Sequence, residues 1–180
     1  FMILGDTCTR ACRFCHIKTH RHGIPVDPDE PRQVAESIRS MNLDYVVITM
    51  VDRDDLEDGG AGHIVRVFEK IRELNPQTKI EILAGDFRGQ TQPLERVVAF
   101  GPTVFAHNIE TVERLTPRVR DRRANYRQSL DVLRRAKRWG TITKSALMLG
   151  LGEEKKEVIQ ALEDLRSVQV DAITIGQYMQ

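Results

Sequence analysis

Short apolar runs of strand type alternate along this chain with segments in which apolar residues recur every three or four positions. The strand-type runs are mostly rich in Val, Ile and Leu, and they cover residues 1–5, 45–50, 79–84, 103–107, 143–149 and 172–175. The segments with helical spacing are 31–42, 62–75, 93–100, 129–139 and 154–168. Six strands with helices between them predict repeated β-α units, whose right-handed crossovers give a parallel sheet covered by helices.

Residues that could bind a ligand or take part in a reaction follow the predicted strands. In chain order they are Cys8, Asp52 to Asp55, Asp86, Asn108 with Glu110, Gly150 to Glu153, and Gln177. Parallel α/β folds place their functional groups where the strands end, so we expect these side chains along one edge of the sheet. The pattern itself allows two architectures, a doubly wound open sheet and a barrel.

Composition and charge fit one α/β domain spanning residues 1–180. A chain of 180 residues with 41% hydrophobic content can bury one sizeable core. The net charge of +1 gives no general attraction to nucleic acid. The apolar runs are far shorter than the roughly 20 residues that cross a bilayer, and no signal-peptide pattern opens the chain. We expect a protein of a reducing compartment, with Phe1 and Gln180 as cut ends of a longer chain.

All three cysteines lie in one short segment, as Cys8, Cys12 and Cys15. An odd number of cysteines clustered in one loop argues against a disulfide framework, which joins pairs of distant residues. Three thiols at this spacing indicate metal ligands. A closed zinc site needs four protein ligands, and histidines at positions 16, 20 and 22 keep that alternative open. A 4Fe-4S cluster on three thiolates instead leaves one iron free for a ligand that is not protein, and ordinary reduced thiols are the third alternative.

The acidic and amide residues after the strands have a structural and a functional interpretation. The run from Asp52 to Asp58 is either a solvated turn or a ligand site. Asn108 and Glu110 either cap the following helix or face a common ligand, because they alternate along a segment that we expect to be extended.

Other candidates are weaker. Gly150 to Glu153 predict a tight turn in which the backbone approaches a ligand, although one G-x-G is little support for a site. Lys144, on the strand before this turn, either pairs with a carboxylate or reaches solvent. His63 and His107 are interpreted as structural histidines, because neither has a second candidate ligand nearby in the sequence.

Residues 114–138 contain ten Arg or Lys against two Asp. Such a stretch is either a solvated helical face or a docking patch for an acidic partner, since clustered positive charge steers association with a negative surface. Nucleic acid is a weaker candidate because interleaved aromatic residues are nearly absent. The predicted docking face consists of Arg118, Arg120, Arg122, Arg123 and Arg127.

The sequence also resembles a known family. Cys8, Cys12, Phe14 and Cys15, directly after an apolar strand, form a C-x-x-x-C-x-aromatic-C motif that resembles the signature of the radical S-adenosylmethionine (SAM) enzymes. Words along the whole chain resemble the lipoyl synthases among them: G-D-T-C-T-R-A-C-R-F-C at 5–15, Y-V-V-I-T at 45–49, V-D-R-D-D-L at 51–56, D-G-G-A at 58–61, D-F-R-G at 86–89, H-N-I-E-T-V at 107–112, L-M-L-G-L-G-E at 147–153 and I-G-Q-Y-M-Q at 175–180.

This resemblance implies a partial parallel (β/α)6 barrel with a 4Fe-4S cluster and SAM as cofactors. Reductive cleavage of SAM would give a 5'-deoxyadenosyl radical that takes hydrogens from a protein-bound octanoyl chain during lipoate biosynthesis. The implied partners are an octanoylated lipoyl-carrier protein and a reductant such as ferredoxin or flavodoxin, with neither nucleic acid nor membrane. The implied location is the cytoplasm, or the mitochondrial or plastid matrix of a eukaryote.

The resemblance also implies site residues. Cys8, Cys12 and Cys15 would bind the cluster, and the SAM contacts would be Phe14, Asp52, Asp54, Asn108, Glu110, Lys144, Gly150, Gly152, Glu153 and Gln177. The chain departs from the family in one respect that bears on activity. Lipoyl synthases carry a second 4Fe-4S cluster that supplies sulfur, and this chain has no cysteine left to bind one. A turn near Trp139 is also shorter than in the family. Two other functions stay open, a different radical SAM activity and a metal-binding module without turnover.

Overall fold

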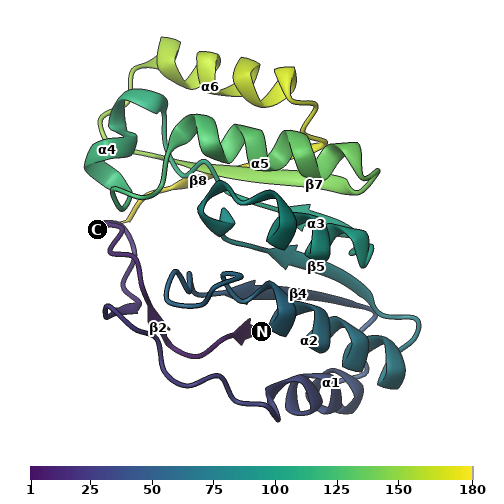
Figure 1. Ribbon diagram of the computed structural model, residues 1–180. Helices are drawn as coiled ribbons and strands as arrows, with labels where there is room; N and C mark the ends of the chain where they lie inside the picture. Colours follow the sequence, from purple (N-terminus) through teal and green to yellow (C-terminus); the bar gives the residue numbers. More distant parts are fainter. Residues whose placement is uncertain (180) are drawn as a thin grey trace.

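The structure, a computed structural model, describes residues 1–179 and is built on a six-stranded parallel sheet (Figure 1). The strands lie side by side in the order in which they occur in the chain. All six overlap the strand-type runs of the sequence, so the predicted strands are confirmed. They are β1 (Met2–Ile3), β4 (Tyr45–Met50), β5 (Lys79–Leu83), β6 (Val104–Ala106), β7 (Ile142–Leu149) and β8 (Ala172–Gln177).

Five long helices connect these strands and confirm the predicted helical segments to within a few residues. In the second of them, Ile64, Val67, Phe68 and Ile71 recur at helical spacing and are fully buried, because this stripe faces the sheet. The fourth is capped at its N-terminus by Asn125, whose side chain accepts hydrogen bonds from two backbone N–H groups of the first turn. The five helices are α1 (Glu30–Ser40), α2 (Ala61–Leu74), α3 (Thr91–Ala99), α5 (Tyr126–Arg138) and α6 (Lys155–Ser167).

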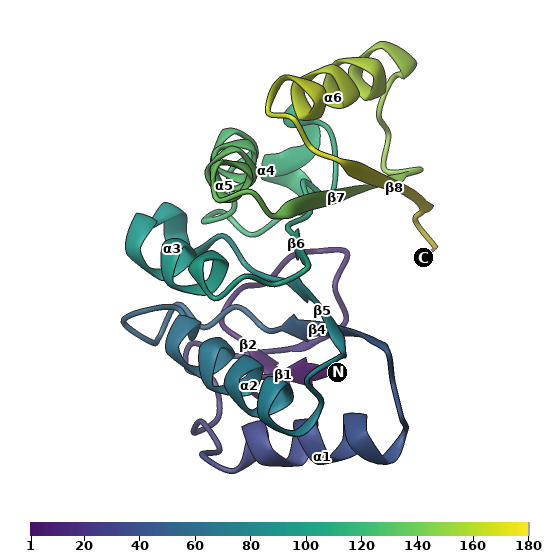
Figure 2. The ribbon, with the colours of Figure 1, turned by 90° about the vertical axis from the view of Figure 1, so that its right-hand side faces the viewer.

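The strand order decides between the two predicted architectures. A doubly wound sheet reverses its strand order at a switch point and places helices on both faces. Here the order β1-β4-β5-β6-β7-β8 contains no reversal, and Figure 2 shows the five long helices in an arc around the outer side of a curved sheet. The fold is therefore a partial barrel, as predicted.

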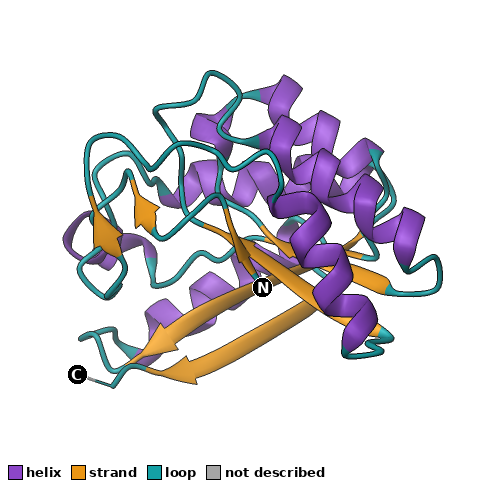
Figure 3. Cartoon of the chain, turned by 90° about the horizontal axis from the view of Figure 1, so that it is seen from below, coloured by secondary structure: helices purple, strands orange, loops and turns teal. Residues whose placement is uncertain are grey.

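The shortest elements could not be predicted, because two to four residues are too few to show a periodic pattern. Strands β2 (Thr7–Cys8) and β3 (Lys18–Thr19) form a separate parallel pair, set apart from the main sheet in Figure 3. The others are the 3-10 helices η1 (Phe87–Gly89) and η2 (Glu113–Leu115) and the single-turn helix α4 (Thr116–Val119).

Two clusters of buried apolar side chains stabilise the fold. The larger one joins α1, α2 and α3 to the strands from β1 to β6, and the smaller one joins α5 and α6 to β7 and the segment around α4. Within residues 1–179, no helix combines the length and the apolar character that crossing a membrane requires.

Candidate active site

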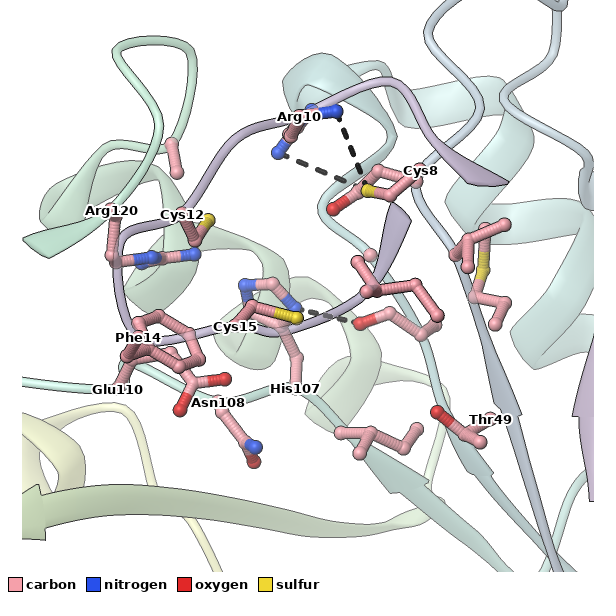
Figure 4. Close-up of a pocket in the computed structure, with 18 of the residues that line it drawn as sticks. Cys8, Arg10, Cys12, Phe14, Cys15, Thr49, His107, Asn108, Glu110 and Arg120 are labelled. Atoms are coloured by element: carbon pink, nitrogen blue, oxygen red, sulfur yellow. Dashed lines mark hydrogen bonds and ion pairs between the residues drawn. The ribbon is translucent and has the colours of Figure 1, made fainter. Parts of the chain in front are cut away.

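The three cysteines line one cavity of about 310 Å³ at the carboxyl ends of the strands. They lie in the cysteine loop, residues 8–17, where Cys8 is buried, Cys12 is half-buried and Cys15 is exposed. Residues at the ends of β4 and β5 and after β6 complete the wall. Of the predicted strand-end residues, Cys8, Asp52, Asn108 and Glu110 therefore gather around one cavity. In Figure 4 the three sulfur atoms face a common space from different sides.

Backbone N–H groups point at two of the three sulfur atoms. The N–H of Arg10 donates to Cys8 Sγ at 3.4 Å, and the N–H of Asp121 donates to Cys12 Sγ at 3.3 Å. Burial raises the pKa of both the Cys8 and the Cys12 thiol. A positively charged metal reverses this preference, because a coordinating thiol loses its proton. The loop therefore holds sulfur atoms that metal binding would convert to thiolates and that already have hydrogen-bond donors.

The arrangement of donors fits an iron-sulfur cluster better than a zinc ion. Zinc needs about four ligands close to 2.3 Å from a single atom when they are thiolates. Among the described residues, no group of three or more His, Cys, Asp or Glu side chains is placed to hold one ion. A 4Fe-4S cluster has no such requirement, because each thiolate binds a different iron. The nearby histidines at 16, 20 and 22 are all exposed and supply no missing ligand.

A buried arginine fixes the cysteine loop to the ends of β4 and β5. The Arg10 side chain is 3% exposed and donates through Nε and Nη2 to Asp54, both at 2.9 Å. Nη2 also donates to Asp86 at 2.6 Å, and Nη1 lies 3.7 Å from Asp52. Gln128 donates to the other oxygen of Asp86 at 2.8 Å. One guanidinium therefore joins the loop between two cysteines to three carboxylates from two strand ends.

The carboxylates around Arg10 have different pKa values. Burial would raise the pKa of Asp86, but the hydrogen bond and charge of Arg10 lower it to about 2. Burial raises the pKa of Asp52 to about 6, with Arg10 as the main opposing influence. Asp86 thus acts as a permanent anion beneath the loop, whereas Asp52 lies on the cavity wall with a weaker pairing to Arg10.

The opposite side of the cysteine loop is fixed by the segment 119–123. The N–H of Ala11 donates to Asp121 Oδ2 at 3.0 Å, and the N–H of Arg13 donates to the Val119 carbonyl at 2.8 Å. Arg123 Nη2 donates to the Thr9 carbonyl at 2.5 Å. The loop is therefore attached both to the strand ends and to the connection between β6 and β7.

A second arginine lies on the cavity wall with one donor unused. Arg120 is 8% exposed, and its Nε is buried without a hydrogen-bond partner among the described residues. Its Nη1 donates to Ser129 Oγ at 2.9 Å. In Figure 4 this side chain lies beside Cys12 and Phe14. An unsatisfied buried guanidinium is costly, and an anionic ligand in the cavity would satisfy it.

His107 holds this arginine in place as a neutral side chain. Its Nδ1 lies 2.9 Å from the Ala84 carbonyl, and its Nε2 lies 2.9 Å from Ser129 Oγ. Because a carbonyl only accepts, we assign the proton to Nδ1, so Nε2 accepts from Ser129 and Ser129 accepts from Arg120. Burial lowers the pKa of His107 to about 4. His107 is a satisfied histidine, as predicted, although it also lines the cavity.

A family model described as the Radical SAM superfamily matches residues 2–165 of this chain. The chain belongs to the radical SAM superfamily. Membership implies a 4Fe-4S cluster and SAM as cofactors, which agrees with the three cysteine thiols around the cavity and the unsatisfied cation on its wall.

Proteins with high sequence identity to this chain include lipoyl synthases. The chain is 53% identical to the mitochondrial lipoyl synthase of Leishmania braziliensis, and the match covers 99% of this chain and 48% of that protein. Identity is 56% to the mitochondrial lipoyl synthase 1 of Pisum sativum, again with 99% and 48% covered, and 56% to the lipoyl synthase of Pyrobaculum arsenaticum, with 99% and 61% covered. The chain therefore spans about half the length of most of these relatives.

Solved structures confirm the radical SAM fold. Methylornithine synthase superposes with a TM-score of 0.78 at 17% identity, covering 99% of this chain and 52% of that chain. The [FeFe]-hydrogenase maturase HydG also gives 0.78, at 16% identity and with 99% and 42% covered.

The structure brings some of the predicted radical SAM site residues together. Phe14, Asp52, Asn108 and Glu110 line the same cavity as the cysteines. Asp54 lies behind them and binds Arg10. The other five, which do not line this cavity, are Lys144, Gly150, Gly152, Glu153 and Gln177.

Those five residues have other partners in the structure. Lys144 Nζ pairs with Glu81 at 2.8 Å, as one of its two interpretations predicted. The Glu153 carboxylate accepts from the backbone N–H groups of Gly150 and Leu151 at 2.6 and 2.9 Å. Gln177 donates to the Leu149 carbonyl at 3.2 Å. Their contact with SAM stays a prediction.

Arg10 and Arg120 were not among the residues predicted for the active site. Neither has a sequence signal of its own, because a buried arginine cannot be distinguished from an exposed one in the sequence. The position of Arg10 between Cys8 and Cys12 was the one available hint.

Proposed function

We propose that this chain performs the radical-forming part of a lipoyl synthase reaction. The observation that carries the proposal is the set of three cysteines around one strand-end cavity, in a chain that is 53–56% identical to lipoyl synthases along 99% of its length. When bound, the cluster supplies the electron that cleaves SAM into methionine and a 5'-deoxyadenosyl radical, which takes hydrogens from an octanoyl chain.

The protein side chains would bind and orient these groups. Cys8, Cys12 and Cys15 hold the cluster through three thiolates. Phe14 offers an aromatic face for the adenine, and Asn108 with Glu110 offers an amide and a carboxyl group for the ribose hydroxyls and the amino group. Apolar side chains at the ends of β4 and β5, including Met50, Val51 and Leu83, line the cavity and exclude water from the reacting atoms.

Arg120 is assigned to the carboxylate of SAM, because its Nε is a buried donor without a partner. Replacing Arg120 with methionine is expected to weaken SAM binding at least about tenfold, the effect of losing a hydrogen bond to a charged group. The measurement is equilibrium dialysis with the reconstituted, oxidised protein. 5'-Methylthioadenosine, which has the adenosine part but no carboxylate, is the matched control ligand, and its affinity is expected to be unchanged. Equal losses for both ligands would contradict the assignment.

The substrate and partners follow from the proposed reaction. We propose an octanoyl group on a lipoyl-carrier protein as the substrate and a one-electron reductant such as ferredoxin or flavodoxin as the electron source. Relatives from Leishmania and Pisum are named as mitochondrial, which supports the mitochondrial matrix if the source is a eukaryote. For a prokaryotic source we propose the cytoplasm. Neither nucleic acid nor a membrane is proposed as a partner.

The 180-residue chain is expected to cleave SAM without making a lipoyl product. Sulfur insertion in lipoyl synthases needs a second cluster, and this chain has no cysteine besides Cys8, Cys12 and Cys15 to bind one. Anaerobic reconstitution should give about four irons per chain, the content of one cluster. After chemical reduction, chromatography should detect 5'-deoxyadenosine but no lipoyl group on an octanoylated carrier.

Two results would overturn this proposal. Lipoyl formation by this chain alone would refute the argument from the missing cysteines. Purification with zinc in place of iron and sulfide, together with no SAM cleavage, would favour a metal-binding module without turnover.

A further inference from the structure

Most of the positive charge in residues 114–138 is already paired within the chain. Arg114 pairs with Glu157 and Arg127 with Glu113. Arg123 pairs with Asp121, both Arg134 and Arg135 pair with Asp131, and Lys137 pairs with Asp171. Arg120 is buried. The predicted five-arginine docking face is therefore wrong as a set, because it includes one buried and two paired residues.

Two arginines of that set, Arg118 and Arg122, are exposed and form no ion pair among residues 1–179. They lie on either side of Val119 and Asp121, which hydrogen-bond to the cysteine loop at Arg13 N and Cys12 Sγ. Arg13 is also exposed and forms no ion pair in the described part of the chain. Arg13 lies on the loop that holds the cluster ligands, and Arg118 and Arg122 lie on the segment beside it; we call these three residues the arginine rim.

The cysteine loop also reaches solvent on one side. Cys15 is exposed and Cys12 is half-buried, whereas Cys8 lies underneath. Nearby acidic side chains are already engaged, Asp121 by Arg123 and by the N–H of Ala11, and Glu113 by Arg127. The rim therefore keeps its full positive charge next to the exposed edge of the metal site.

We propose that the arginine rim docks an acidic one-electron carrier protein that reduces the cluster. This inference rests on the proposed function, which requires an electron from outside the chain. One electron leaves the carrier, which is oxidised by one, and enters the cluster, which is reduced by one, without any bond or proton being exchanged. An acyl-carrier substrate fits the rim less well, because its acyl group must enter the cavity, whereas an electron has only to reach the cluster ligands on the exposed side of the loop. Transient electron-transfer complexes have small interfaces, and exposed charges mainly set how fast they form.

The test compares two triple variants of equal net charge. The rim variant carries Arg13→Glu, Arg118→Glu and Arg122→Glu. The control variant carries Arg39→Glu, Arg138→Glu and Arg166→Glu, three exposed arginines in or next to the last turns of α1, α5 and α6, which lie at the opposite end of the barrel. Association of each reconstituted protein with a flavodoxin, an acidic one-electron carrier, is followed by stopped-flow mixing at low and high salt.

The rim variant is expected to associate at least about 10-fold more slowly at low salt, because electrostatic steering changes association rates by 10-fold or more. Its rate should then rise with added salt, because salt screens the repulsion between the three glutamates and the acidic carrier, whereas the control should stay within about 2-fold of the unsubstituted protein. Equal slowing in both variants, or slowing in neither, would overturn the proposal, as would a rim variant that loses affinity for an octanoylated carrier protein but not for flavodoxin.

Two further measurements separate this inference from the proposed function. Iron and sulfide content reports whether each variant still assembles its cluster. SAM cleavage driven by a chemical reductant reports the proposed function without any carrier protein. If SAM cleavage persists while flavodoxin association is unaffected by the rim variant, only the docking inference fails; if the unsubstituted protein cleaves no SAM, the proposed function fails.

Discussion

Replacing Cys8, Cys12 or Cys15 with alanine, one at a time, is expected to abolish assembly of the 4Fe-4S cluster. Each thiolate is the protein ligand of one iron, so any single loss leaves two protein ligands for four irons. The different exposures of the three cysteines should not change this result, because their roles are equivalent. The measurements are iron and sulfide content after anaerobic reconstitution, the visible absorption of the cluster, and release of 5'-deoxyadenosine.

A histidine supplies the control for the cysteine variants. His16 directly follows Cys15 and is exposed, so His16→Ala should keep normal iron and sulfide content. The variant would lose metal only if the histidines supplied a ligand, as in the zinc interpretation. A cysteine variant with a normal cluster spectrum would show that the ligand assignment is wrong.

Replacing Arg10 with methionine is expected to destabilise the protein by about 3–5 kcal/mol, the cost of removing one partner from a buried ion pair. The change leaves Asp86 without its cation under the cysteine loop and leaves Asp54 with Arg123, 3.2 Å away, as its remaining cation. It is measured by urea unfolding of the metal-free protein. The cluster content of the variant should also fall, because the loop loses its attachment to the strand ends.

The loss of stability in Arg10→Met should depend on pH. In the unsubstituted protein, the depressed pKa of Asp86, about 2, means that its contribution to stability is present above the unfolded pKa of about 3.9 and is lost as the pH falls toward 2. In the variant, burial without a cation raises the pKa of Asp86, so protonation relieves the penalty. The difference in unfolding free energy between the two proteins should therefore be largest at neutral pH and shrink toward pH 4.

Two controls make the Arg10 result specific. Arg32 pairs with Asp29 and Glu36 in an exposed position, and Arg32→Met should cost less than about 1 kcal/mol. Arg10→Lys keeps the charge but loses the paired hydrogen bonds to Asp54, so its stability should lie between those of the other two. If Arg10→Met unfolded at the same urea concentration as the unsubstituted protein, the attachment of the loop through Arg10 would be refuted.

The long elements were predictable because their burial leaves a periodic pattern. Helix α2 shows this directly, since Ile64, Val67, Phe68 and Ile71 face the sheet together. The choice of a barrel was not available from the pattern, because strand order depends on which neighbours pair and the βα repeat is the same in both architectures. The family resemblance supplied that choice, and the parallel, unreversed strand order confirmed it.

The cysteines that line the cavity were predictable as a cluster, but the geometry of the site was less so. Asn108 and Glu110 do line the cavity, but the reason given for it was wrong. Glu110 has a left-handed backbone with φ of 67°, so the two side chains share a wall through a turn rather than through strand alternation. Within the acidic run after β4, Asp52 lines the cavity, whereas Asp54 and Asp55 pair with Arg10 and Arg53, which neither interpretation of the run predicted. Both outcomes depend on residues distant in the sequence.

The attachment of the cysteine loop to segment 119–123 has a consequence for the order of folding. The contacts that join them span 109, 110 and 114 residues of sequence, and such closures cost chain entropy before packing repays it. None of these contacts can form before segment 119–123 has been synthesised. During synthesis on the ribosome, the cysteine loop therefore cannot complete its contacts until more than two thirds of the 180 residues have been made. We therefore expect cluster assembly to follow synthesis of segment 119–123, with the three cysteines as unprotected thiols until then.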